Sequence, residues 1–478
     1  MKIITGITLL VLTILVSLRV SAQDGKIWTL EECINYALDH NINIKKQYLN
    51  INSQEELLLQ SKLGMLPNFN GYASHGYNWG QRVDPFTNEF ATDRVRSNNI
   101  YLQGDLNLWS GFRQLNTVKK NKLNFQKAQF DADYFKDDIS ISVATEYLQT
   151  LYYLEFVEMA KNQLEITNQQ VERTQKLVDA GTLAKGDLLT IEAQQASEEL
   201  SLVDAENNLS LSYLNLSQLM ELQTAEGLQI DKPDLGVIDQ PEMYTPDKLY
   251  TTAVETRPEI KSAEMNVQSY EMDLKIARGN YYPRLSLSGS LGSGYSGANQ
   301  IGEDPFDYLP QIGVTENNLA VFPVEPVTGF GSYNPKPFSD QLKDNLNETM
   351  NLSLSIPIFN GWVSRSNVAQ AKIGIENANL DLELQKNNLY KILQQAYNDA
   401  LSAFNRHKAA DKKVQATGES FKYAEQKFNV GLINSVEYND AKKEYNNALS
   451  ELIQAKFDYV FRITVIDFYL GKPITLNK

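Results

Sequence analysis

The chain has 478 residues, a formal net charge of -15 at pH 7 and a single cysteine. This negative net charge argues against binding to nucleic acid, and a single cysteine excludes an internal disulfide framework. The length allows two or three domains of ordinary size, so the order of the predicted elements decides how the chain is divided.

The first 22 residues have the build of a secretory signal peptide. Lys2 supplies a positive start, residues 7–16 are apolar, and residues 20–22 offer a small-residue cleavage site. A membrane anchor is the alternative, but the apolar stretch is shorter than the roughly 18 residues that a spanning helix needs. We therefore expect an exported chain that begins at residue 23.

The mature sequence contains an internal duplication. The segment from Ala37 aligns with the segment from Ala253 at an offset of 216 residues, which pairs Pro67 with Pro283. Each repeat begins with a helical pattern that ends just before its paired proline. In the first repeat this pattern covers about 35 residues, from Leu30 to Gly64. A duplicated order of elements is predicted.

Two glycine pairs show where the repeats diverge in length. Gly111 in LWSGF matches Gly361 in IFNGW, and Gly181 in LVDAGTL matches Gly431 in FNVGLIN, both at an offset of 250. The 34 additional residues therefore lie before Gly361 in the second repeat. This interval is rich in proline, and we expect a long irregular loop over residues 297–346.

Strand patterns follow the first helix of each repeat, at about 67–110 and 283–358. Apolar residues alternate with polar ones there, which is typical of half-buried strands. Each repeat contributes two strands. A soluble β-sandwich is the alternative to a membrane barrel, but four strands form neither a convincing sandwich nor a closed barrel. Two chains would supply eight strands and three chains twelve.

A helix-rich stretch of about 70 residues runs from Gly111 to Gly181 and again from Gly361 to Gly431. Such a helix would be about 105 Å long, so these helices are expected to associate as coiled coils or to project as a tube. A return helix follows each second glycine. The expected division is a signal peptide (1–22), a first repeat (23–230, tip turn at 181), a connector (231–246), a second repeat (247–471, tip turn at 431) and a C-terminal tail (472–478).

With this duplicated order, the chain resembles the TolC-like outer-membrane efflux proteins over nearly its whole mature length, and FNVGLIN with the acidic helix start after it is the most specific local match. The resemblance implies an α+β membrane protein, in which a long α-helical coiled-coil barrel joins a β-barrel of four strands per protomer and twelve in a trimer. It implies a location in the outer membrane of a Gram-negative bacterium, with a periplasmic tunnel. The implied function is a passive exit duct of a tripartite efflux or type I secretion system. The implied partners are two further copies of the chain, a periplasmic adaptor protein, an inner-membrane pump and outer-membrane lipid, without nucleic acid.

The resemblance also assigns roles to residues near the two glycine turns. A periplasmic gate, an acidic constriction, is carried onto Glu437, Asp440 and Asp187. The adaptor-docking tip is carried onto Ala180, Gly181, Thr182, Leu183, Val430, Gly431 and Leu432. Acids also favour the first turns of any helix, which is the ordinary explanation for Asp187. Some family members have an arginine where this chain has Ile433, so the gate is expected to be held differently.

The sequence contains no convincing motif for an enzyme active site or a cofactor site. GSGYSG at 292–297 fits a dinucleotide pattern, but no helix is predicted after it to receive a phosphate. His40, His75 and His407 lie far apart, and Cys33 is interpreted as a small apolar core residue. We therefore expect no catalytic, cofactor or metal site. The alternative function is a non-conducting coiled-coil scaffold or an envelope adhesion protein.

Overall fold

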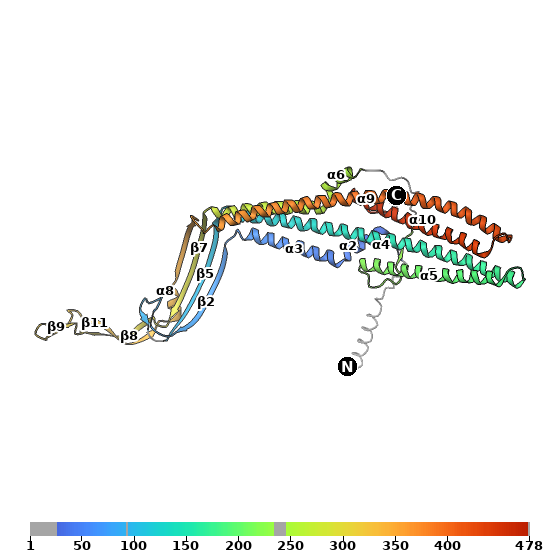
Figure 1. Ribbon diagram of the computed structural model, residues 1–478. Coiled ribbons are helices and arrows are strands. Elements are labelled where there is room, and N and C mark those ends of the chain that lie inside the picture. The colour runs from blue at the N-terminus through green and yellow to red at the C-terminus, as the bar shows by residue number, and fades with distance from the viewer. Residues whose placement is uncertain (1–25, 92–93, 234–244, 477–478) are drawn as a thin grey trace, which may run out of the picture. The chain divides into compact units, whose positions relative to one another are not determined.

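The computed structural model of the chain describes residues 26–91, 94–233 and 245–476 (Figure 1). The predicted signal peptide (1–22) and most of the predicted connector (231–246) lie outside these residues. The chain divides into a helical unit (residues up to 55, 123–268 and 376 onward) and a strand unit (residues 56–122 and 269–375). Within the described ranges, no helix is long and apolar enough to cross a membrane.

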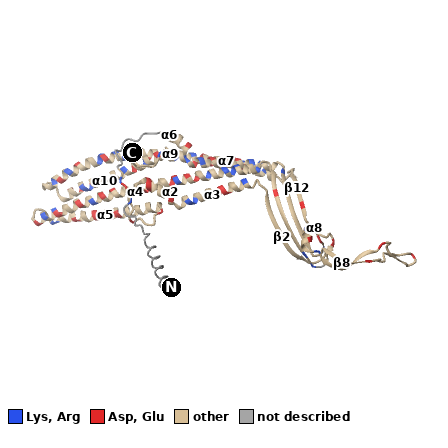
Figure 2. Ribbon diagram, turned by 180° about the vertical axis from the view of Figure 1, so that it is seen from behind, with Lys and Arg blue, Asp and Glu red and all other residues tan. Residues whose placement is uncertain are grey.

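Two long helical hairpins have equal dimensions. Helices α4 (Arg113–Asp179) and α9 (Val363–Asn429) each contain 67 residues. The return helices α5 (Lys185–Leu219) and α10 (Ser435–Tyr469) each contain 35 residues. In the helical unit both turns lie at the same end (Figure 1), and acidic and basic residues are both spread along the helices (Figure 2). The equal lengths agree with the duplication seen in the sequence.

The helix expected from Leu30 to Gly64 is two helices, α2 (Leu30–His40) and α3 (Ile42–Leu63). The break comes at Asn41, whose Oδ1 accepts hydrogen bonds from the main-chain N–H groups of Asn43 and Ile44, at 2.9 and 3.2 Å. An asparagine side chain that satisfies these N–H groups starts a new helix there.

The second repeat breaks at the equivalent position. Helix α6 (Pro246–Thr256) ends before Arg257, and α7 (Pro258–Arg278) begins after it. Arg257 has an extended conformation, with φ -68° and ψ 130°, because the proline ring disfavours the helical region for the preceding residue. The single-helix expectation overlooked both signals.

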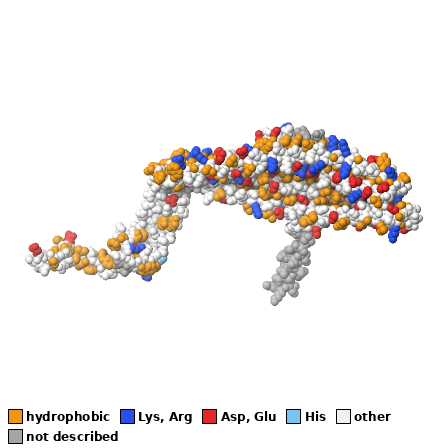
Figure 3. All heavy atoms as spheres, viewed as in Figure 1, with side chains coloured by type: hydrophobic (Ala, Val, Ile, Leu, Met, Phe, Trp, Pro, Cys, Tyr) orange, Lys and Arg blue, Asp and Glu red, His pale blue; other side chains and the backbone are white. Residues whose placement is uncertain are grey.

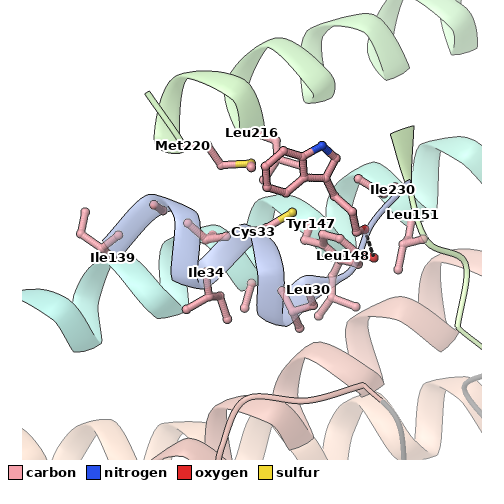
Figure 4. Close-up of a cluster of buried hydrophobic side chains, with 14 of the residues drawn as sticks. Leu30, Cys33, Ile34, Ile139, Tyr147, Leu148, Leu151, Leu216, Met220 and Ile230 are labelled. Atoms are coloured by element: carbon pink, nitrogen blue, oxygen red, sulfur yellow. Dashed lines mark hydrogen bonds between the residues drawn. The ribbon is translucent and has the colours of Figure 1, made fainter. Parts of the chain in front are cut away.

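A hydrophobic core in the helical unit holds α2 against α4 and the end of α5 (Figure 4). Here β1 (Ile27–Trp28) pairs in parallel with β6 (Gln229–Ile230). The Tyr147 hydroxyl on α4 donates to the main-chain oxygens of Trp28 and Asp231, at 3.1 and 2.9 Å. Cys33 is fully buried in this core, as predicted.

The strand unit contains a four-stranded antiparallel sheet. Its strands are β2 (Asn68–Asn78), β5 (Val95–Trp109), β7 (Arg284–Ser296) and β12 (Asn347–Ser355), in the order β12-β7-β5-β2. The second predicted strand range, which extends to residue 358, runs past the end of β12 at Ser355. The β5–β7 pairing joins the two repeats, and β2 and β12 form the two edges.

The interval 297–346 is not the irregular loop that was expected. It contains an antiparallel ribbon of β8 (Gln300–Tyr308) and β11 (Val327–Pro335), followed by α8 (Phe338–Asp344). Two-residue strands β9 (Gly313–Val314) and β10 (Ala320–Val321) pair beyond it. A two-stranded ribbon leaves one edge of each strand free, so it tolerates Pro305 and Pro335. Hydrophobic side chains are visible along this ribbon (Figure 3).

Three short elements complete the described strand unit. They are β3 (Arg82–Val83), β4 (Phe90–Ala91) and the 3-10 helix η1 (Gly279–Tyr281).

Candidate functional site

The first turn (residues 180–183) reverses the chain between α4 and α5. Gly181 has φ +72°, a conformation that L side chains rarely adopt. Its N–H donates to the Val178 oxygen at 2.9 Å, and the Thr182 N–H donates to the Leu177 oxygen at 2.9 Å. These two bonds form a Schellman motif, which satisfies the last carbonyl groups of α4.

The second turn (residues 430–433) is built in the same way. Gly431 has φ +76°, and its N–H donates to the Phe428 oxygen at 3.1 Å. The Leu432 N–H donates to the Lys427 oxygen at 2.9 Å. A Cβ placed at either turn glycine would meet nothing within 4 Å, so glycine is required for its backbone angle and not for space.

The predicted docking residues include the most exposed apolar side chains of the turns. Val430 is 70% exposed and Leu432 is 73% exposed. Ala180, Gly181, Thr182 and Gly431 are also exposed, whereas Leu183 and Ile433 are half-buried. The structure thus brings the predicted tip residues of each turn to the surface of the helical unit. Exposed apolar groups of this kind are typical of contact surfaces.

The return helices begin differently in the two hairpins. Asn434 precedes α10, and its Oδ1 accepts from the Glu437 N–H at 2.9 Å. Ala184 precedes α5 and makes no side-chain cap bond. The second hairpin therefore has the better-satisfied helix start.

The three predicted gate acids have different surroundings. Asp187 is half-buried on α5, and its Oδ1 accepts a hydrogen bond from the Ser435 hydroxyl on α10 at 2.6 Å. Glu437 and Asp440 are both exposed. Asp187 links the two hairpins, while Glu437 and Asp440 share the exposed side of α10.

Sequence reasoning missed a third acid on this side. Glu444 is exposed and follows Glu437 by seven residues, a spacing that returns to the same side of a helix. We call Glu437, Asp440 and Glu444 the acidic face. The seven-residue spacing was visible in the sequence and could have revealed Glu444.

Further contacts tie the second turn to its surroundings. Arg173 on α4 donates to the Asn429 side-chain oxygen at 2.5 Å. The ring of Tyr438 stacks on Phe428, with ring centroids 4.8 Å apart. Burial raises the pKa of the Tyr438 hydroxyl to about 12, so this group is neutral at physiological pH. The turn is therefore held by polar and aromatic contacts.

Over the described residues, no group of His, Cys, Asp and Glu side chains is arranged to hold a metal ion. In the GSGYSG stretch, Gly292 and Gly294 lie within β7. An extended strand does not present the helix N-terminus that binds a phosphate.

A family model described as "Outer membrane efflux protein" matches residues 33–221 and 249–471. These two segments include both hairpins and all four strands of the sheet. The chain belongs to the outer membrane efflux protein family. It is therefore an outer-membrane protein with a periplasmic helical tunnel, and it serves as an exit duct for efflux or type I secretion.

Two curated relatives and one solved structure resemble this chain at low sequence identity. The Escherichia coli outer membrane protein TolC is 22% identical over 451 residues, which cover 92% of this chain and 80% of that protein. The Pseudomonas aeruginosa alkaline protease secretion protein AprF is 20% identical over 340 residues, covering 70% of this chain and 61% of that protein. The solved Vibrio cholerae outer membrane protein VceC has a TM-score of 0.73 at 15% identity, over 93% of this chain and 96% of that one. The similarity to VceC shows that the two chains share the same fold.

Proposed function

We propose that three copies of this chain form a passive exit duct, which receives substrate from an inner-membrane pump through a periplasmic adaptor. The observation that supports a shared barrel is the four-stranded sheet with its two edge strands, β2 and β12. Open edges are not tolerated in lipid, so the edge of one copy needs the edge of the next. Three copies supply twelve strands, an even number suited to an outer-membrane barrel.

We further propose that the acidic face lines the narrow periplasmic end of the tunnel. Three copies would gather six carboxylates from Glu437 and Asp440 around one axis. A ring of carboxylates attracts cations and excludes anions, and this sets the charge preference of the pore. The exposure of both side chains supports this assignment.

The closed end would be held by contacts between the two hairpins in place of the arginine that this chain lacks at Ile433. The Ser435 hydroxyl donates to Asp187 at 2.6 Å, and Arg173 donates to Asn429. Hydrogen bonds to charged groups are the stronger class of such contacts. In this proposal Asp187 belongs to the gate as a link between hairpins, and the carboxylates of the acidic face line the opening.

The adaptor would dock on the two turns. Val430 and Leu432 supply exposed apolar surface, with Ala180, Gly181, Thr182, Leu183 and Gly431 around it. Crosslinking from Thr182 or Leu432 in intact cells, followed by identification of the captured proteins, tests this contact. Capture of a periplasmic adaptor and its pump is the expected outcome, and it would also indicate whether drugs, metal ions or polypeptides are the cargo. Efficient crosslinking that captures no adaptor would contradict the docking site.

The gate is tested by Glu437→Ala with Asp440→Ala in planar bilayers. We expect the channel to lose most of its cation preference, measured as the reversal potential in a KCl gradient, because the six carboxylates of Glu437 and Asp440 are removed. The matched control is Glu192→Ala with Glu199→Ala, which removes two exposed acids from α5 and should leave the preference intact. An unchanged reversal potential in the first variant would reject the gate, and a protein that is soluble without detergent and conducts nothing would favour the scaffold alternative.

A further inference from the structure

A buried charged cluster joins α10 to α4 and α5. Lys442 Nζ is 3.3 Å from Glu198 Oε1 on α5, and the two side chains are 3% and 8% exposed. The Thr167 hydroxyl on α4 donates to Glu198 and accepts a hydrogen bond from Lys442. We call Lys442, Glu198 and Thr167 the positioning cluster. It joins one residue from each of three helices.

The buried Glu198 carboxylate of the positioning cluster has several hydrogen-bond partners. Gln194 donates from its side-chain amide to Glu198 Oε1 at 2.8 Å, in addition to the contacts with Lys442 and Thr167. Burial lowers the pKa of Lys442, and the Glu198 carboxylate opposes that shift. Removing one member of such a pair leaves an uncompensated buried charge. The cluster therefore resists rotation or sliding of α10 against α4 and α5.

The buried residues of α10 and its acids form two opposite stripes. Ser435, Tyr438 and Lys442 are 1%, 2% and 2% exposed, and we call them the anchor face. Each residue of the acidic face follows an anchor residue by two positions, which is a rotation of about 200° around a helix. Ser435 and Lys442 contact the first hairpin, and Tyr438 packs against Phe428 of α9. The acidic face points away from these contacts.

The duplication does not repeat the ionic cluster. At the offset of 250 residues, Thr167 matches Thr417, but Glu198 matches Ala448 and Lys442 matches Glu192. The equivalent positions therefore cannot form the same ion pair. Because only one of the two arrangements carries the pair, a role beyond hairpin packing is indicated.

We propose that the positioning cluster sets the rotation and the axial register of α10 that direct Glu437 and Asp440 into the pore. Lys442 is thus a positioning residue for charge selection, acting through the acidic face. This inference rests on the proposed function, in which the acidic face lines the periplasmic end of the tunnel.

The test uses Lys442→Met in the full-length trimer, with the reversal potential measured in a KCl gradient. We expect most of the cation preference to be lost, because α10 no longer holds the carboxylates in place. Removal of a positive charge would by itself increase cation preference, so the expected change has the opposite sign to a simple charge effect. The neighbouring exposed Lys443→Met is the matched control and should retain the preference.

Two further variants separate positioning from loss of folding. Lys442→Met with Glu198→Met removes both buried charges, and we expect it to restore the preference, because apolar residues of similar volume often replace a buried pair. Glu198→Gln is the mildest change, and it is expected to weaken the preference while the trimer still assembles. In the Glu437→Ala, Asp440→Ala background, Lys442→Met should cause no further loss.

The outcomes distinguish this inference from the proposed gate. A wild-type channel without cation preference rejects both. A cation-selective wild type whose assembled Lys442→Met and Glu198→Gln variants keep the full preference rejects the positioning role alone. An equal loss caused by Lys442→Met in the presence and in the absence of Glu437 and Asp440 would also reject it, because the effect would then not pass through these two acids.

Discussion

The two helical turns have the same backbone conformation, but the acidic residues on the return helices that follow them have different surroundings. Gly181 and Gly431 have φ values of +72° and +76°, and both close a Schellman motif. After the first turn, the gate candidate Asp187 is bound to Ser435. After the second, Glu437 and Asp440 are exposed. The duplication preserved the reversal of the chain, while the acids diverged into a contact between hairpins and a free acidic face.

The largest expected effect comes from breaking the buried ion pair of Lys442 and Glu198, which the duplication does not repeat. Glu198→Ala should lower the free energy of unfolding by about 3–5 kcal/mol, because it leaves Lys442 charged and buried without its partner. The neighbouring exposed Glu199→Ala should change it by less than about 0.5 kcal/mol. Denaturant unfolding of the two purified variants checks this prediction. Equal effects would show that the pair does not hold the hairpins together.

The turn glycines should behave alike. Gly181→Ala and Gly431→Ala are each expected to cost about 1–2 kcal/mol, because an L side chain is strained at these φ values. Gly186→Ala is the control within α5, where alanine should stabilise the helix by roughly 0.5–1 kcal/mol. Thermal unfolding of all three variants gives the comparison. Clearly unequal costs at the two turns would contradict their structural equivalence.

The helix starts should respond in opposite directions. Asn434→Ala is expected to cost about 1 kcal/mol, because the Glu437 N–H loses its side-chain acceptor. Ala184→Asn is expected to stabilise α5 by up to about 1 kcal/mol, because it supplies the cap that the first hairpin lacks. Unfolding midpoints measured in the same detergent test both changes. A stabilising Asn434→Ala would show that this cap is not formed.

The smallest effect is expected at the native cysteine. Burial raises the pKa of the Cys33 thiol to about 12, so at pH 8 only about one thiol in 10⁴ is ionised and reactive. Iodoacetamide should leave Cys33 unmodified in the folded protein and modify it after denaturation. Cysteines introduced at Thr182 and Leu432 should react at similar rates, because both turns are exposed. Rapid modification of native Cys33 would contradict its burial.

Several features were predictable because they depend on local patterns. The glycines at 181 and 431, the equal hairpin lengths and the four strands of the sheet follow from spacing, periodicity and the duplication. Other local signals were present and were overlooked. Asn41 caps the start of α3, and Pro258 ends the preceding helix, α6. The ribbon in 300–335 was obscured because its prolines suggested irregular structure.

By itself, the sequence determined the duplicated order of elements, the two glycine turns and the acidic residues that follow them, since each depends on neighbours along the chain. Only the tertiary structure decided which side chains meet. Lys442 and Glu198 are 244 positions apart, and Asp187 and Ser435 are 248 apart. Their contacts depend on how one hairpin is rotated and shifted against the other. That arrangement is set by the packing of buried side chains from three helices, which no single stretch of sequence specifies.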